Sequence, residues 1–212
     1  MDDGHTPVIC IADIPEAVSC PQFVDTYALM QKKIQNTCHQ TLDSFLEAIE
    51  NFVEYKKKQF FGLDDCTLSE EVAFITSRDL STITSGATRP TKAFQSPFVG
   101  ESIQQVGDWF VKNIVPSDGY THCSFLVMDS QTAEDNTCIV VYAAEDEVES
   151  FRCEFSLAQT QINSLEFGSG VVKEGSRALF METGEVMTKE KYELALKGRL
   201  YVEDGKLKTK EE

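Results

Sequence analysis

The chain has 212 residues, 42% of them hydrophobic, and a formal net charge of −16 at pH 7. Such a composition can bury a sizeable core, which excludes a chain that is disordered throughout. Nucleic acids and anionic membranes are bound mainly through Lys and Arg, so the excess of acids predicts direct binding to neither.

The N-terminal part of the chain predicts a short extended arm followed by a long helix. Residues 6–17 fit a strand or extended arm. Residues 22–61 contain neither Gly nor Pro, and apolar residues recur there in steps of three and four. This spacing predicts a long amphipathic helix over 21–61, or two helices in series.

The apolar face of this predicted helix is the main candidate for a partner interface. Its proposed anchors are Phe45, Ile49, Phe52 and Phe60. A face this apolar is stable only when something covers it, which fits a helix–helix contact or a homodimer. The alternative is that the face covers the protein's own sheet. The sequence leaves both open.

The middle of the chain predicts two more helices separated by a loop. Residues 67–83 fit a helix in which Thr67 and Glu70 form a capping box. The segment 84–97 is rich in Ser, Thr, Gly and Pro, which is typical of a loop. Residues 101–115 predict a further amphipathic helix.

Three strands are predicted after these helices, at 122–128, 138–144 and 151–158. The connections between them are too short for a crossover helix, so the strands should form an antiparallel meander over 122–158. One face of this meander is expected to pack on the helices.

Residues 129–150 contain seven acids and no base. The seven are Asp129, Glu134, Asp135, Glu145, Asp146, Glu147 and Glu149. They predict an acidic surface, which either faces solvent or attracts a basic protein partner.

The C-terminal part repeats one pattern, because LFMETGEVMTKE at 179–190 and LYVEDGKLKTKE at 200–211 agree at six of twelve positions. Each copy has a Gly between apolar positions, which predicts a β-hairpin with a tight turn. A short helix capped by Thr188 and closed by Gly198 is predicted between them. Either shared turn rules or a duplication explains the repeat.

The sequence contains no motif that identifies a reaction, and we predict no cofactor and no metal site. One enzymatic combination deserves consideration, in which His122 activates Cys123, Cys138 or Cys153. Because these cysteines lie within apolar strands, core packing is the favoured interpretation. The scattered, odd number of cysteines favours free thiols in an intracellular, cytoplasmic protein, with the nucleus as the alternative.

Together the elements predict an α+β fold. A long N-terminal amphipathic helix and shorter helices would pack on a mostly antiparallel sheet, built from the meander and the C-terminal hairpins. The parts are 1–62, 63–100 and 101–212, unless all form one domain. The predicted function is a non-catalytic protein–protein interaction or assembly module. The alternatives are an acidic inhibitor that mimics nucleic acid, and a small-ligand binder or cysteine-dependent enzyme.

Overall fold

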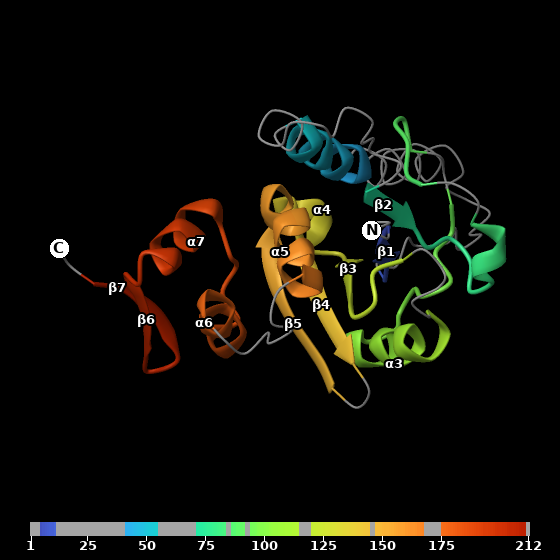
Figure 1. The fold of residues 1–212 in the computed structure, drawn as a ribbon. Helices are drawn as coiled ribbons and strands as arrows, with labels where there is room; N and C mark the ends of the chain where they lie inside the picture. The colour runs from blue at the N-terminus through green and yellow to red at the C-terminus, as the bar shows by residue number, and fades with distance from the viewer. Residues whose placement is uncertain are drawn as a thin grey trace, which may run out of the picture.

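The computed structural model describes residues 5–11, 41–54, 71–83, 86–91, 94–114, 120–144, 147–167 and 175–210. These residues form an α+β fold with a mixed five-stranded sheet and a separate two-stranded sheet (Figure 1). The predicted fold class is confirmed at this level. Of the long helix predicted at 21–61, only residues 41–54 are described, and these are helical.

The strands are β1 (Thr6–Cys10), β2 (Val72–Phe74), β3 (Ser124–Met128), β4 (Thr137–Ala144), β5 (Glu147–Glu154), β6 (Leu200–Glu203) and β7 (Lys206–Thr209). The named helices are η1 (Leu80–Thr82), α3 (Ile103–Asn113), α4 (Thr132–Asp135), α5 (Phe155–Phe167), α6 (Ser176–Thr183) and α7 (Lys189–Leu196). Among the described residues, no helix has the length and apolar character needed to cross a membrane.

The five-stranded sheet has the order β2-β1-β3-β4-β5. Its second half, β3-β4-β5, is the predicted antiparallel meander. Its first half is parallel, because β1 pairs in parallel with both β2 and β3. The prediction of a mostly antiparallel sheet therefore needs correction, since the parallel pairs join segments that lie far apart in the sequence.

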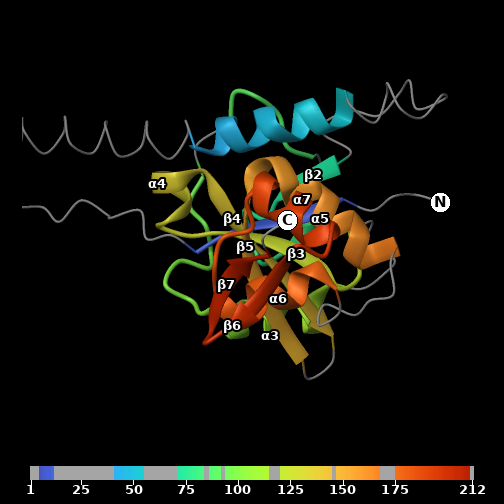
Figure 2. The ribbon, with the colours of Figure 1, turned by 90° about the vertical axis from the view of Figure 1, so that its left-hand side faces the viewer.

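Helices cover both faces of this sheet. Helical residues 41–54 and α5 lie on one face, and α3 lies on the other (Figures 1 and 2). Helix α3 approaches β5 so closely that a Cβ on Gly107 would meet Val148 Cγ2 at 2.7 Å. One core cluster combines residues from all three predicted parts, among them Val8, Val72 and Phe180.

Two segments differ from their predicted secondary structure. The described residues of the helix predicted at 67–83 include strand β2 and the short 3-10 helix η1, and only residue 71 is α-helical. The sequence of a strand that is buried on both faces is a short apolar run, and periodicity alone cannot distinguish such a run from a segment of a buried helix. The strand predicted at 151–158 ends at Glu154, and Phe155 begins α5. The ring of Phe155 packs edge-on against Phe45, with centroids 5.3 Å apart.

The C-terminal repeat also departs from prediction in one copy. The prediction of a hairpin at 179–190 is wrong, because the residues before its glycine are helical. Helix α6 runs to Thr183, and Gly184 ends it with φ 67°. The hairpin predicted at 200–211 is confirmed as β6 and β7, which turn at Asp204 and Gly205. The predicted helix between them is confirmed as α7, in which the Thr188 side chain accepts a hydrogen bond from the Lys191 N–H.

Candidate functional site at the carboxyl end of β3

The adjacent parallel strands β1 and β3 mark the place where a ligand site is most expected. Helical residues 41–54, which lie between β1 and β2 in the sequence, pack on one face of the sheet, and α3, which lies between β2 and β3, packs on the other. In open sheets of this kind, ligands bind at the carboxyl ends of the strands where the connections diverge. There the Ile11 N–H donates to the Met128 carbonyl at 2.8 Å. Asp129 follows directly, so its surroundings form the candidate site.

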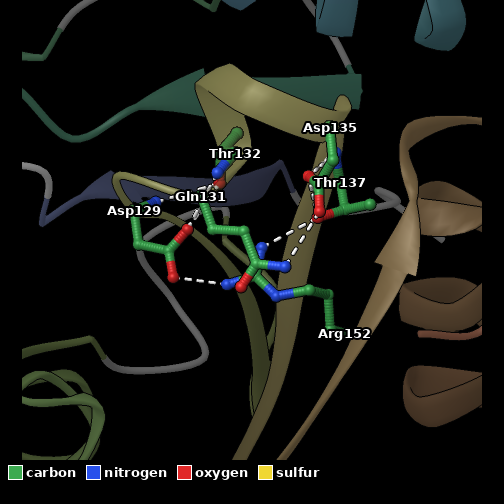
Figure 3. Close-up of polar contacts among 6 residues, drawn as sticks. All are labelled: Asp129, Gln131, Thr132, Asp135, Thr137 and Arg152. Atoms are coloured by element: carbon green, nitrogen blue, oxygen red, sulfur yellow. Dashed lines mark hydrogen bonds and ion pairs between the residues drawn. The ribbon is translucent and has the colours of Figure 1, made fainter. Parts of the chain in front are cut away.

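A reciprocal set of hydrogen bonds joins Asp129 to Thr132 (Figure 3). The Asp129 carboxylate accepts from the Thr132 N–H and hydroxyl, both at 3.0 Å. In return, the Asp129 N–H donates to the Thr132 hydroxyl oxygen at 3.0 Å. These bonds fix the turn that leads from β3 into α4.

Arg152 of β5 closes the network from the other side (Figure 3). Its guanidinium forms an ion pair with Asp129 and donates to the Thr137 hydroxyl at 2.8 Å. The Arg152 side chain is only 12% exposed. Because a buried charge is costly without a partner, Asp129 is the counter-ion that makes this position tenable.

Asp135 completes the network at the start of β4. Its carboxylate accepts from the Thr137 hydroxyl at 2.6 Å and from the Gln131 amide at 2.9 Å. Burial raises the pKa of Asp135, but these hydrogen bonds and the charge of Arg152 lower it more, so the pKa falls below its ordinary value. The polar groups of the network thus bond to one another, and these bonds stabilise the conformation of the β3–β4 loop.

Sequence reasoning identified the two acids of this network but missed Arg152. A signal was available, since Arg152 is the only Lys or Arg between residues 113 and 172. It also sits at a polar position of an alternating strand, next to a stretch with seven acids and no base. A lone base beside such a stretch indicates an ion pair.

The predicted acidic surface is divided between the two ends of the sheet. Asp129, Glu134 and Asp135 lie where β3 ends and β4 begins, whereas Glu147 and Glu149 lie at the opposite end of β4. Strand β4 has eight residues, which span about 27 Å at ~3.4 Å each. Glu134 is exposed, and Asp129 is half-buried in its ion pair. Glu145 and Asp146 lie outside the described residues.

The proposed helix anchors face the interior where they are described. Phe45 and Ile49 are fully buried in the core, and Phe52 is half-buried. Phe60 lies outside the described residues. The described part of the apolar face therefore covers the protein's own sheet, and Phe45 or Ile49 could reach a partner only if the helix left it. A partner contact there stays a prediction.

At the amino end of β3, Glu166 of α5 binds the segment that contains the predicted Cys–His pair. Its carboxylate accepts from the His122 and Cys123 N–H groups at 3.1 and 3.2 Å, and from the Ser124 hydroxyl at 2.5 Å. Burial, the charge of Glu166 and a hydrogen bond to it raise the pKa of Cys123 to about 12. A thiol held protonated at neutral pH is a poor nucleophile. Glu166 thus anchors α5 to β3.

The described residues contain no group of three or more His, Cys, Asp and Glu side chains placed to hold a metal ion. The candidate site is therefore a polar network that fixes a loop at the carboxyl end of the parallel strands. In comparisons with known proteins, no family model, curated protein or solved structure matches the chain.

Proposed function

We propose that the protein is a non-catalytic binding module that engages a basic protein partner through its acidic body, defined as residues 1–174. The distribution of charge supports this. The acidic body holds 27 acids and 11 bases, whereas residues 175–212 hold eight of each. The whole net charge thus belongs to one part of the chain. A field of one sign attracts partners of the opposite sign and speeds their association.

The few bases of the described acidic body are largely neutralised already. Its described residues hold 15 acids and four bases. Three of the bases form ion pairs within the body: Arg78 with Glu101, Arg89 with Glu50, and Arg152 with Asp129. The surplus acids therefore set the sign of the surface field.

One helix face concentrates these acids. Four acids of the helical residues 41–54 recur in steps of four, three and four, which places them on one side of the helix. They are Asp43, Glu47, Glu50 and Glu54, and we call them the acidic helix face. The face lies opposite the buried Phe45 and Ile49.

A basic loop of the same chain already binds to the acidic helix face, and this observation carries the proposal. The Arg89 guanidinium lies 2.7 Å from a Glu50 oxygen and 4.0 Å from a Glu47 oxygen. The Thr91 N–H and hydroxyl donate to Asp43 at 2.9 and 2.6 Å. Figure 2 shows this loop, in green, beside the helix. A partner segment with a guanidinium and a hydroxyl could be recognised by the same groups.

The test is quantitative capture of a basic protein from a lysate, with the wild-type chain compared with Glu47→Gln/Glu50→Gln/Glu54→Gln. We expect one basic protein to be retained. Its retention should fall about tenfold in the variant and should also fall with rising salt, because exposed charges at an interface attract a partner through forces that salt screens. The matched control is Glu182→Gln/Glu190→Gln/Glu193→Gln, which removes the same charge outside the acidic body and should keep full capture.

A further variant asks whether the loop competes for the acidic helix face. Arg89→Gln removes the guanidinium that occupies this face, so capture should rise. Equal capture by wild type and the triple variant would disprove the proposal. Release of the partner by added nucleic acid would identify the interaction as the predicted nucleic-acid mimicry, and light scattering of the free chain tests the homodimer.

A further inference from the structure

We propose that Cys138 and Cys153 form a site of reversible oxidation, at which an intramolecular disulfide joins β4 to the edge strand β5. The inference concerns the core between these strands and is independent of the partner binding proposed above. It rests on strand register, on the shared burial of the two thiols and on the position of β5 in the sheet.

The register places the two cysteines directly opposite each other. Arg152 and Glu154 direct their backbone groups away from β4, because the Arg152 carbonyl accepts from the Met187 N–H and the Glu154 N–H donates to the Met187 carbonyl. Backbone groups alternate along a strand, so those of Cys153 face β4. Opposed residues of this kind have Cα atoms about 5.5 Å apart. A disulfide requires Cα atoms ~4.4–6.8 Å apart, which this pair meets, and Cβ atoms about 3.5–4.5 Å apart. Opposed Cβ atoms of such a pair are about 5.5 Å apart, so the strands must close by about 1 Å when the bond forms.

The side chains are buried together as well. Both residues are free and 0% exposed, and the Cys138 thiol lies near enough to raise the pKa of Cys153. They share one core cluster, in which they point toward the same face of the sheet. No other pair of described cysteines is paired in strand register. The geometry therefore selects this pair over Cys10 and Cys123.

The oxidant we assign is a low-molecular-weight disulfide such as oxidised glutathione. The thiolate of one cysteine attacks a sulfur of the oxidant, forming a mixed disulfide and releasing one small thiolate. The thiolate of the second cysteine then attacks the protein sulfur of the mixed disulfide and releases the second small thiolate. The two cysteine protons end on the two released thiols, and the two electrons reduce the oxidant's disulfide bond.

The position of the pair sets the rate of this reaction. The neighbouring Cys138 thiol, followed by burial, raises the pKa of Cys153, which keeps its reactive thiolate scarce. Strand β5 is an edge strand, bound to β4 on one side and to Met187 on the other. Transient separation of β5 from β4 exposes both thiols together. Oxidation is therefore expected to be slow in the native protein and faster under mild denaturation.

The test uses the full wild-type chain incubated with oxidised glutathione, first in native buffer and then in urea below the unfolding transition. Free thiols are then blocked, and the protein is mapped by mass spectrometry without reduction. We expect a peptide pair joined through Cys138 and Cys153, with two hydrogens lost. We also expect a thermal midpoint several degrees higher, reversed by a reductant, because the bond restricts the unfolded chain.

Matched variants separate this pair from the other thiols. Cys138→Ala should abolish both the joined peptide and the rise in thermal midpoint, whereas Cys123→Ser should retain both. The proposal is overturned if Cys138 and Cys153 stay reduced in both buffers, or if oxidation joins either of them to another cysteine.

Discussion

The two copies of the C-terminal repeat agree at half their positions and nevertheless fold differently. In the first copy, the residues before the shared glycine belong to α6, and Gly184 ends that helix. In the second copy, the residues on either side of the glycine form β6 and β7. Both glycines have nearly the same φ, 67° and 68°. The shared glycine therefore specifies a left-handed residue, and its neighbours decide what that residue is used for.

The residue before each glycine is the main difference. Asp204 takes φ 54°, so the second copy has two consecutive left-handed residues, as a two-residue hairpin turn requires. Thr183 occupies the equivalent position, and a β-branched residue resists that conformation. It stays helical instead, and its hydroxyl donates to the Leu179 carbonyl at 2.8 Å. The strand-favouring Val202 of the second copy replaces the more helix-compatible Met181.

The largest expected contrast between the copies comes from their aromatic residues. Phe180 is fully buried in the core, whereas the equivalent Tyr201 is half-buried on the hairpin. Phe180→Ala should lower the free energy of unfolding by about 3–5 kcal/mol, and Tyr201→Ala by about 1 kcal/mol. Urea denaturation followed by circular dichroism measures both. If the alanine variant does not fold, Phe180→Leu takes its place in the comparison, because it removes fewer buried atoms. Equal costs at the two positions would refute the contrast.

Exchanging the residues before the glycines tests the turn itself. Asp204→Thr should cost about 1–2 kcal/mol, because it forces a β-branched residue into the left-handed region. The reciprocal Thr183→Asp should cost about 0.5 kcal/mol, since it removes one part-buried hydrogen bond and places an acid at a helix C-terminus. Hydrogen exchange of the β6 and β7 amides should accelerate in Asp204→Thr alone. Unchanged protection would show that the turn residue does not determine the hairpin.

The smallest expected effect concerns the residue after each glycine. Glu185 accepts from the Lys191 ammonium at 2.8 Å and from the Leu207 N–H at 3.1 Å, so the first copy binds the second. These hydrogen bonds lower the pKa of Glu185. The stability it adds is therefore present above about pH 4.5 and lost as the pH falls below that value. Glu185→Gln should cost about 0.5–1 kcal/mol at pH 7.

The pH dependence supplies the check on this last prediction. The stability difference between wild type and Glu185→Gln should shrink below pH 4, when measured by urea denaturation at several pH values. The exposed Lys206 occupies the equivalent position in the second copy, and Lys206→Gln should change stability by no more than about 0.3 kcal/mol. A constant difference at all pH values would contradict the role given to the Glu185 carboxylate.

The sequence predicted the elements whose signals are local. Helix α3 has helical spacing and a capping residue, Ser102, and the β6–β7 hairpin has Asp-Gly at its turn. Strand β2 was missed because a run of three residues fits the period of a helix as well as that of a strand. The first repeat copy was misassigned because its glycine was interpreted without its neighbour, Thr183.

The candidate site was predictable only in part, because its bonds join segments far apart in the sequence. Asp129 was recognised as an acid but assigned to an open surface. Its partner Arg152 lies 23 residues away. A lone base beside the acidic stretch indicates an ion pair, but only the pairing of β5 with β4 shows which acid Arg152 binds. The anchoring of residues 122–124 by Glu166 spans more than 40 residues and gives no sequence signal.

The position of β1 between β2 and β3 has a consequence for the order of folding. The meander pairs strands that are neighbours in the sequence, so it can form early. Strand β1 instead pairs Thr6 with Val72 and Val8 with Leu126, which lie 66 and 118 residues apart in the sequence. Such contacts raise the contact order and slow folding. Strand β1 therefore precedes the other strands of this sheet in the sequence but is expected to pair after the meander has formed.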